Sequence, residues 1–186
     1  VLLNDLLKDW DGEVIRLAML SGHYRAPLDW TDDLLEQAKT TLGRIYGALR
    51  RVWEHDFVSG QALPPIDKGV RDALRDDLNT PIALAELSRL AGEANGAADR
   101  KDEAGMAEAK ANLMAAGSLL GLLQKTPAQW EQGGDDDDKA RIDGLVAARN
   151  AARANKDWAE ADRLRDALKA EGIEIMDGAG GATWRR

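Results

Sequence analysis

The sequence predicts a mainly α-helical protein: a helical bundle followed by a small unit of two helices and a short β element. Helix formers such as Ala and Leu are abundant, and charged residues make up 31% of the chain. Valine and isoleucine are sparse, which argues against a large sheet. Apolar residues recur at three- and four-residue steps, the pattern of helices that bury one face.

The amino-terminal half shows these helices most clearly. The apolar spacing predicts two short helices between residues 2 and 20, broken near Asp11 and Gly12. A long amphipathic helix is expected from Asp32 to His55, with Thr31 as its cap and acidic residues in its first turn. Glycine and two prolines predict a loop at residues 59–65.

Three further helices are expected before the middle of the chain changes character. Asn79 or Thr80 is a good N-cap for one of them, and Pro81 suits the first helical turn because its missing N–H would be unpaired there. The expected ranges are 67–77, about 81–95 and about 102–123. Helices joined by short loops are typical of a bundle.

Residues 125–139 are expected to form a flexible acidic linker. The segment holds a proline, two glycines and a run of four aspartates, so like charges repel and apolar anchors are scarce.

After the linker, the sequence predicts a separate minidomain over residues 140–186. A first helix is expected at 140–154. Asp157 and Glu160 have the spacing of a reciprocal capping box for a second helix that ends near Glu171. Gly172 fits the left-handed position after a helix, residues 173–176 resemble a strand, and residues 177–181 are expected to turn.

Composition and charge restrict the function classes. The net charge of −8 argues against a general nucleic-acid coat protein, although residues 140–186 carry nine basic and eight acidic side chains and are the better candidate for contacting phosphates. Cysteine is absent, so disulfides and thiolate sites are excluded, and the two histidines lack zinc-ligand spacing. No membrane-spanning run or signal peptide is visible, so a cytoplasmic protein is expected.

Three segments together resemble one protein family. They are HYRAPLDW within residues 12–30, DDLNTP within 76–95, and KDWAEAD with the terminal TWRR within 149–186. In combination and in this order they are similar to the carboxy-terminal part of bacterial cysteinyl-tRNA synthetases. The resemblance implies a junction after the catalytic domain at 1–30, a DALR-type helical bundle at 31–124, the linker at 125–139 and an anticodon-binding minidomain at 140–186.

The resemblance also implies partners and cofactors. The full enzyme attaches cysteine to tRNA(Cys) with ATP, and its catalytic domain binds ATP and zinc. The HIGH and KMSKS signatures and the zinc-binding cysteines of that domain are absent from this sequence. No cofactor is therefore expected in this chain, which is predicted to be inactive alone. The expected partners are tRNA(Cys) and the catalytic domain of the same enzyme, and a monomer without membrane contact is expected.

Four residues match the positions that hold the anticodon in this family: Arg153, Trp158, Asp162 and Asp177. Their chemistry suits the task. An indole at a helix start can stack on an unpaired base, and carboxylates accept hydrogen bonds from the amino groups of guanine, cytosine and adenine. Asp162 lies four residues after Trp158, on the same helix face. An arginine can donate to base carbonyls and ring nitrogens.

Residue type and spacing alone also fit structural roles at these positions. Trp158 could be a packing cap, Asp162 could pair with Arg165 or Arg163, and Asp177 could form a turn. Arg153 could be a solvated helix end.

A second set of possible tRNA contacts comprises Arg185, Arg186, His23 and Arg25. The ring of Trp184 could instead pack against the minidomain, and His23 and Arg25 could serve at a domain boundary.

Two other functions fit parts of the sequence. The first is a noncatalytic helical interaction module or a free-standing synthetase relative, in which the long helix at 32–55 would bind a partner helix. The second is a related ligase that joins cysteine to a sugar amine. That group lacks the tRNA-reading tail, so the intact KDWAEAD and TWRR segments count against it.

Overall fold

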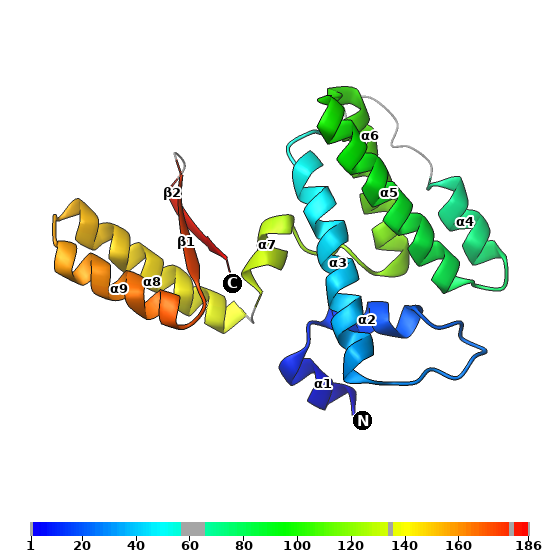
Figure 1. The fold of residues 1–186 in the computed structure, drawn as a ribbon, viewed down its shortest axis with the longest axis horizontal. Helices are drawn as coiled ribbons and strands as arrows, with labels where there is room; N and C mark the ends of the chain where they lie inside the picture. The colour runs from blue at the N-terminus through cyan, green and yellow to red at the C-terminus, as the bar shows by residue number, and fades with distance from the viewer. Residues whose placement is uncertain (1, 57–65, 134–135, 179–180, 186) are drawn as a thin grey trace. The chain divides into compact units, whose positions relative to one another are not determined.

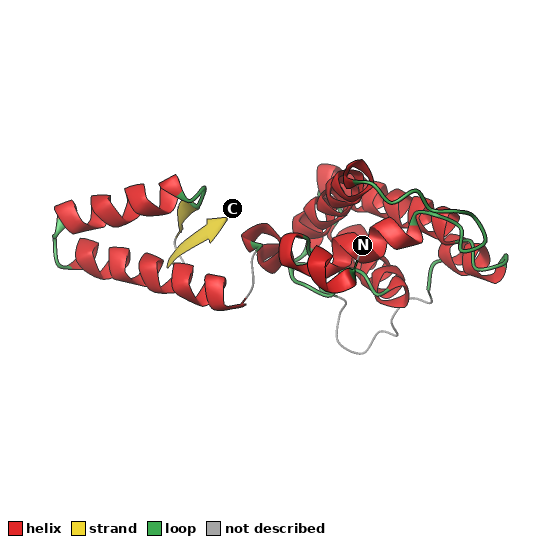
Figure 2. Ribbon diagram, turned by 90° about the horizontal axis from the view of Figure 1, so that it is seen from below, coloured by secondary structure: helices red, strands yellow, loops and turns green. Residues whose placement is uncertain are grey.

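The computed structural model describes residues 2–56, 66–133, 136–178 and 181–185, and within them the chain is mostly helical (Figures 1 and 2). It divides into two compact units, Val1–Pro127 and Ala128–Arg186. The predicted loop at 59–65 lies outside the described residues. The mainly α fold class is confirmed.

The first unit is a helical bundle. Its helices are α1 (Leu3–Asp9), α2 (Gly12–Leu20), α3 (Asp32–Val52), α4 (Lys68–Arg75), α5 (Thr80–Arg100) and α6 (Glu103–Leu120). Helix α5 packs against α3, α4 and α6, and α2 packs against α3 (Figure 1). The apolar stripe predicted for the long helix is buried as expected, at Leu35, Ala38, Leu42, Ile45, Leu49 and Val52.

Side-chain caps mark where α3 and α5 begin. Thr31 accepts a hydrogen bond from the Leu34 backbone N–H at 3.2 Å, and Asn79 accepts one from Ile82 at 3.3 Å. Both predicted caps are confirmed. Helix α5 continues five residues beyond the predicted end at Asn95, because small helix-compatible residues extend it to Lys101, whose φ of 55° ends it.

A buried carboxylate joins three parts of the bundle. Glu13 on α2 accepts hydrogen bonds from the Tyr46 hydroxyl on α3 at 3.1 Å and from the backbone N–H groups of Leu123 and Gln124 at 2.8 and 3.0 Å. Burial raises the pKa of Tyr46, so its hydroxyl remains a donor. Residues 1–30, expected to be the remnant of a junction after a catalytic domain, contribute α2 to the core of this unit.

Helix α7 (Pro127–Gln132) begins at the boundary between the units, and all but its first residue belong to the second unit. The second unit also contains α8 (Asp136–Ala154), α9 (Trp158–Ala170) and an antiparallel pair of strands, β1 (Glu174–Gly178) and β2 (Gly181–Arg185). Helices α8 and α9 pack side by side, β2 packs against α8, and β1 packs against α9 (Figure 2). The core of this unit consists of Ile142, Val146, Leu168, Ile173 and Trp184.

The predicted linker at 125–139 is wrong in part, because the structure places regular helix inside it. Helix α7 occupies Pro127–Gln132, and α8 begins at Asp136, within the aspartate run. The Asp138 carboxylate in the first turn of α8 is favoured there by the positive end of the helix dipole. Arg141 adds a local counter-charge by contacting Asp138 at 2.9 Å.

Two further local predictions are corrected. Asp177, expected in a turn, lies in β1 opposite Ala182, because the ladder continues to the pair Gly178 and Gly181. The capping box of α9 is only half formed. Asp157 accepts from the Glu160 backbone N–H at 3.2 Å, but its own N–H donates to the Ala152 carbonyl. The Glu160 carboxylate contacts Arg163 instead.

Candidate nucleic-acid interface

The turn between α8 and α9 places Trp158 at an exposed helix start. Helix α8 ends at Ala154, and Lys156 takes a left-handed φ of 60° that reverses the chain. Asp157 then caps α9, so Trp158 is its first residue. Trp158 is 59% exposed and is therefore not a buried packing cap. A large aromatic ring presented to solvent at this position is free to stack on a planar ligand.

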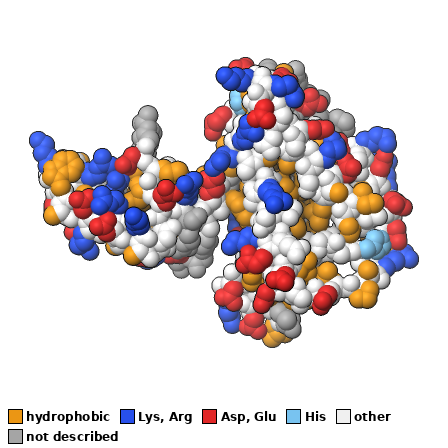
Figure 3. Space-filling model, in the orientation of Figure 1, with side chains coloured by type: hydrophobic (Ala, Val, Ile, Leu, Met, Phe, Trp, Pro, Cys, Tyr) orange, Lys and Arg blue, Asp and Glu red, His pale blue; other side chains and the backbone are white. Residues whose placement is uncertain are grey.

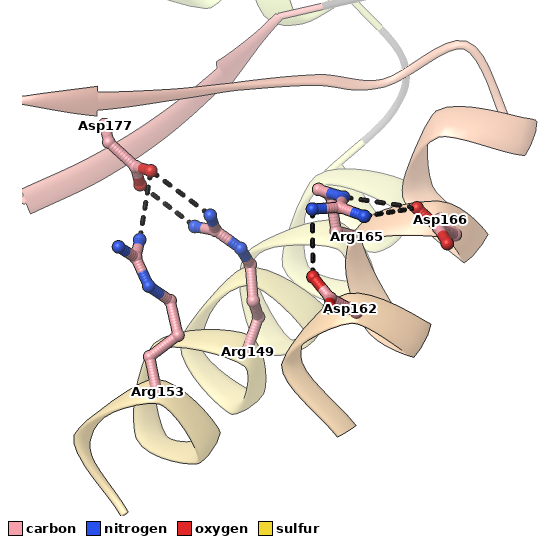
Figure 4. Close-up of polar contacts among 6 residues, drawn as sticks. All are labelled: Arg149, Arg153, Asp162, Arg165, Asp166 and Asp177. Carbon is pink, nitrogen blue, oxygen red and sulfur yellow. Dashed lines mark hydrogen bonds and ion pairs between the residues drawn. The ribbon is translucent and has the colours of Figure 1, made fainter. Parts of the chain in front are cut away.

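Asp177 lies between two arginines of α8 (Figure 4). Arg149 donates from Nη1 to Asp177 Oδ1 at 2.9 Å and from Nη2 to Oδ2 at 3.2 Å. Arg153, one helical turn later, donates from Nη1 to Oδ2 at 3.0 Å. The contact between strand β1 and helix α8 thus joins two of the four predicted residues, Arg153 and Asp177, directly.

The two arginines keep the Asp177 carboxylate ionised. Hydrogen bonding by Arg149, supported by the charges of both guanidinium groups, lowers the pKa of Asp177 to about 2. The same contact raises the pKa of Arg149, and the nearby Asp162 carboxylate adds to this rise. Near neutral pH the cluster therefore presents one anionic acceptor beside cationic donors.

Asp162 and its neighbours form a second ionic group on α9 (Figure 4). Arg165 contacts Asp162 at 2.9 Å and Asp166 at 3.0 Å, and all three side chains are at least half exposed. The structural alternative raised for Asp162, a pair with Arg165, is what the structure contains. An exposed ion pair of this kind is weak, so it leaves the carboxylate available to a competing donor.

Arg149 is the member of the cluster that sequence reasoning missed. Its side chain is only 10% exposed, whereas that of Arg153 is 44% exposed. The available signal was the i, i+4 spacing of two arginines within the helix predicted at 140–154. That spacing places both guanidinium groups on one face of α8.

The carboxy terminus has a structural role at Trp184. The ring is 3% exposed within the core of the unit, and its Nε1–H donates to Asp143 at 2.7 Å. The prediction that this ring packs against the minidomain is confirmed. Arg185 contacts Glu174 across the strand pair at 2.5 Å and is nearly half exposed. Arg186 lies outside the described residues.

His23 and Arg25 meet a different aspartate, in the first unit. Arg25 Nη2 lies 3.0 Å from Asp77, His23 Nε2 lies 3.9 Å from it, and the Tyr24 hydroxyl donates to it at 2.7 Å. The cluster ties the loop after α2 to the turn before α5. This arrangement supports the structural alternative for these residues, although the Arg25 side chain is largely exposed.

The helical face of the second unit mixes charges of both signs. Figure 3 shows Lys and Arg side chains interleaved with Asp and Glu over α8 and α9, without a continuous basic surface. Such a face lacks the continuous basic surface that is typical of general binding to phosphates. Among the described residues, no cluster of histidine and acidic side chains is suited to a metal ion, and no helix is long and apolar enough to cross a membrane.

The arrangement offers three complementary chemistries within one small unit. The exposed indole supplies a stacking surface, Asp162 and Asp177 supply acceptors, and Arg153 supplies donors at half exposure. Side chains of these kinds suit single-stranded nucleotides, because the bases are unstacked and their Watson–Crick edges are free.

Comparison with known proteins assigns both units to families. The model of the DALR domain matches residues 69–124, and the model of the cysteinyl-tRNA ligase anticodon binding domain matches residues 135–185. The second match includes Arg153, Trp158, Asp162 and Asp177.

Curated relatives match the chain from end to end. They include the cysteine–tRNA ligases of Hyphomonas neptunium, 66% identical over 186 residues, Phenylobacterium zucineum, 49% identical over 187, and Xanthomonas campestris, 49% identical over 185. The alignments cover at least 99% of this chain and 39% of each relative. The chain therefore spans well under half the length of these relatives.

Proposed function

The chain belongs to the cysteine–tRNA ligase family, and we propose that it is the part of such an enzyme that binds tRNA(Cys) and reads its anticodon. One observation carries the proposal above all. An exposed indole and a cluster of ionised groups lie within the residues that match the anticodon binding domain.

In this function the indole of Trp158 stacks on one unpaired anticodon base. A stack of this kind contributes about 1–3 kcal/mol and tolerates any base, because every base has a π-face. Stacking therefore gives affinity with little selectivity. It also requires the ring to be accessible before binding, which agrees with its 59% exposure.

Selectivity in this function comes from the ionic groups. The anticodon of tRNA(Cys) consists of guanine, cytosine and adenine, each of which carries an exocyclic amino group. Asp162 and Asp177 accept from such groups, and Arg153 donates to ring nitrogens or carbonyls. A wrong base leaves a desolvated carboxylate or guanidinium without a partner, which costs about 1–3 kcal/mol.

The remaining partners follow from the same proposal. The rest of the ligase supplies ATP binding, zinc binding and the attachment of cysteine, and it acts in the cytoplasm as a monomer. The helical bundle of the first unit orients the tRNA toward that catalytic part. Arg185, Arg186 and Arg25 are candidates for phosphate contacts.

A competition experiment tests anticodon reading. Fluorescently labelled tRNA(Cys) is bound to the chain and displaced by short RNA hairpins that carry its anticodon loop. The cognate hairpin is expected to compete about 5- to 150-fold better than hairpins with one changed anticodon base, the range that 1–3 kcal/mol implies.

Two results would contradict the proposal. Equal competition by all hairpins would reduce the interaction to sequence-independent binding of phosphates. No binding of the labelled tRNA would leave the helical interaction module as the better description.

A further inference from the structure

The two arginines that contact Asp177 are not equivalent. Arg149 contacts both carboxylate oxygens in a two-point arrangement and has a side chain that is 10% exposed. Arg153 contacts only Oδ2 and has a side chain that is 44% exposed. Both come from the same face of α8, one turn apart (Figure 4). Burial and geometry therefore separate an inner partner from an outer one.

We propose that Arg149 is a positioning residue that holds the Asp177 carboxylate as its permanent partner, while Arg153 exchanges Asp177 for a base edge when RNA binds. This inference rests on the proposed function, and it assigns the two arginines different roles within the same site.

The hydrogen-bonding capacity of the carboxylate supports this division. An ionised carboxylate has about four acceptor positions, and the two arginines use three of them. Departure of Arg153 frees a second position, on Oδ2, toward the exposed side of the cluster. A base edge that carries an amino group beside an acceptor can then bind both side chains. Its acceptor accepts a hydrogen bond from Arg153, and its amino group donates one to Asp177, so that neither side chain is left without a partner.

Electrostatics explains why Arg149 has to remain paired with Asp177 when Arg153 leaves. Without Arg149, the departure of Arg153 would leave Asp177 with no cation among its contacts in the described part of the chain. With Arg149 in place, the carboxylate remains ionised and its plane remains fixed by two parallel hydrogen bonds. Arg149 depends equally on Asp177, because a buried guanidinium without a partner is costly. Asp162 adds negative charge near the same group.

The chain offers a matched pair of variants to test this assignment. Arg149→Met and Arg153→Met each remove one guanidinium group of α8 that contacts the Asp177 carboxylate. Carbon-detected NMR titration measures the pKa of Asp177 in each variant, and hairpin competition measures the affinity ratio between cognate and single-base-changed RNA. Thermal unfolding reports whether each variant remains folded.

The expected results differ between the two variants. Arg149→Met should return the pKa of Asp177 most of the way to its ordinary value near 4, and should reduce selectivity at one anticodon position about fivefold or more. Arg153→Met should leave most of the pKa depression intact. Arg149→Lys restores the charge without the two-point contact, so it should recover much of the pKa depression and only part of the selectivity.

A double-variant comparison separates positioning from a purely structural role. In the background of Asp177→Asn, Arg149→Met should cause no further loss of selectivity, since it acts through the carboxylate. A uniform loss of affinity for all hairpins, with unchanged ratios, would overturn the proposal and make Arg149 a structural residue. An Arg153→Met variant that raises the pKa of Asp177 as much as Arg149→Met does would also overturn it.

The failure of this inference can be told from failure of the proposed function. If the wild-type chain does not discriminate between the hairpins, anticodon reading fails and the positioning role fails with it. If the wild-type chain discriminates and Arg149→Met discriminates equally well, only the positioning role fails.

Discussion

Replacing Trp158 with alanine should remove affinity for RNA and leave the fold intact. The indole is 59% exposed, so its removal leaves no cavity in the core. The cap of α9 is the neighbouring Asp157, which the substitution does not touch, and alanine is the best helix former at the new first position. The free energy of unfolding is therefore expected to change by no more than about 0.5 kcal/mol.

The loss of binding follows from the lost stack. A contribution of about 1–3 kcal/mol corresponds to a roughly 5- to 150-fold rise in the dissociation constant. The loss should be similar for cognate and changed hairpins, because stacking does not distinguish base edges. Trp158→Phe should retain part of the affinity, since a smaller ring still offers a face.

The measurement combines a hairpin titration with thermal unfolding followed by circular dichroism. Trp184→Ala is the matched control, because that ring is buried and donates to Asp143. Its loss should destabilise the second unit by about 3–5 kcal/mol. An unchanged dissociation constant for Trp158→Ala would refute the reasoning, as would a loss of binding that occurs only together with unfolding.

The full-length enzyme gives a second readout of the same substitution. Trp158→Ala is expected to weaken the charging of tRNA while leaving formation of the aminoacyl adenylate unchanged. A decrease in adenylate formation would show that the ring acts elsewhere.

Three more predictions concern stability. Glu13→Ala leaves the Tyr46 hydroxyl and two backbone N–H groups without their buried acceptor, so chemical denaturation should show a loss of about 2–4 kcal/mol; a change below 1 kcal/mol would contradict the network. Gly172→Ala should cost about 1 kcal/mol by the same measurement, because its φ is +78° and no neighbour crowds the added methyl group. The pKa of Asp177 is lowered to about 2, so the stabilisation from its pairing is present above about pH 4 and is lost as the pH falls through 2. Acid titration of Asp177→Asn should lack this component, and identical acid curves would argue against the pair.

Local signals in the sequence were sufficient for most of the helices. Thr31 and Asn79 are caps whose partners lie three residues away, so short-range chemistry determines them. The apolar stripe of α3 is likewise periodic within one segment. The linker prediction was wrong in part because charge density alone does not reveal that a helix begins at Asp136.

The candidate site was predictable only in part, because its contacts join distant segments. Arg149 and Asp177 are 28 positions apart, and their meeting depends on the pairing of β1 with β2. A prediction of a turn at Asp177 was natural, since aspartate followed by glycine favours turns. Residue type also could not predict that Trp158 is exposed while Trp184 is buried, since both residues are tryptophans.

The proposed function assigns affinity and selectivity to different side chains. In that proposal the exposed Trp158 contributes to the binding of any unstacked base, whereas the carboxylate of Asp177 distinguishes bases only while its orientation is fixed. That orientation comes from the buried guanidinium group of Arg149, which acts through Asp177 and requires no direct contact with RNA. Trp158→Ala should thus raise all dissociation constants together, whereas Arg149→Met should change their ratios. If both variants produced the same pattern, stacking and edge recognition would not be independent in this unit.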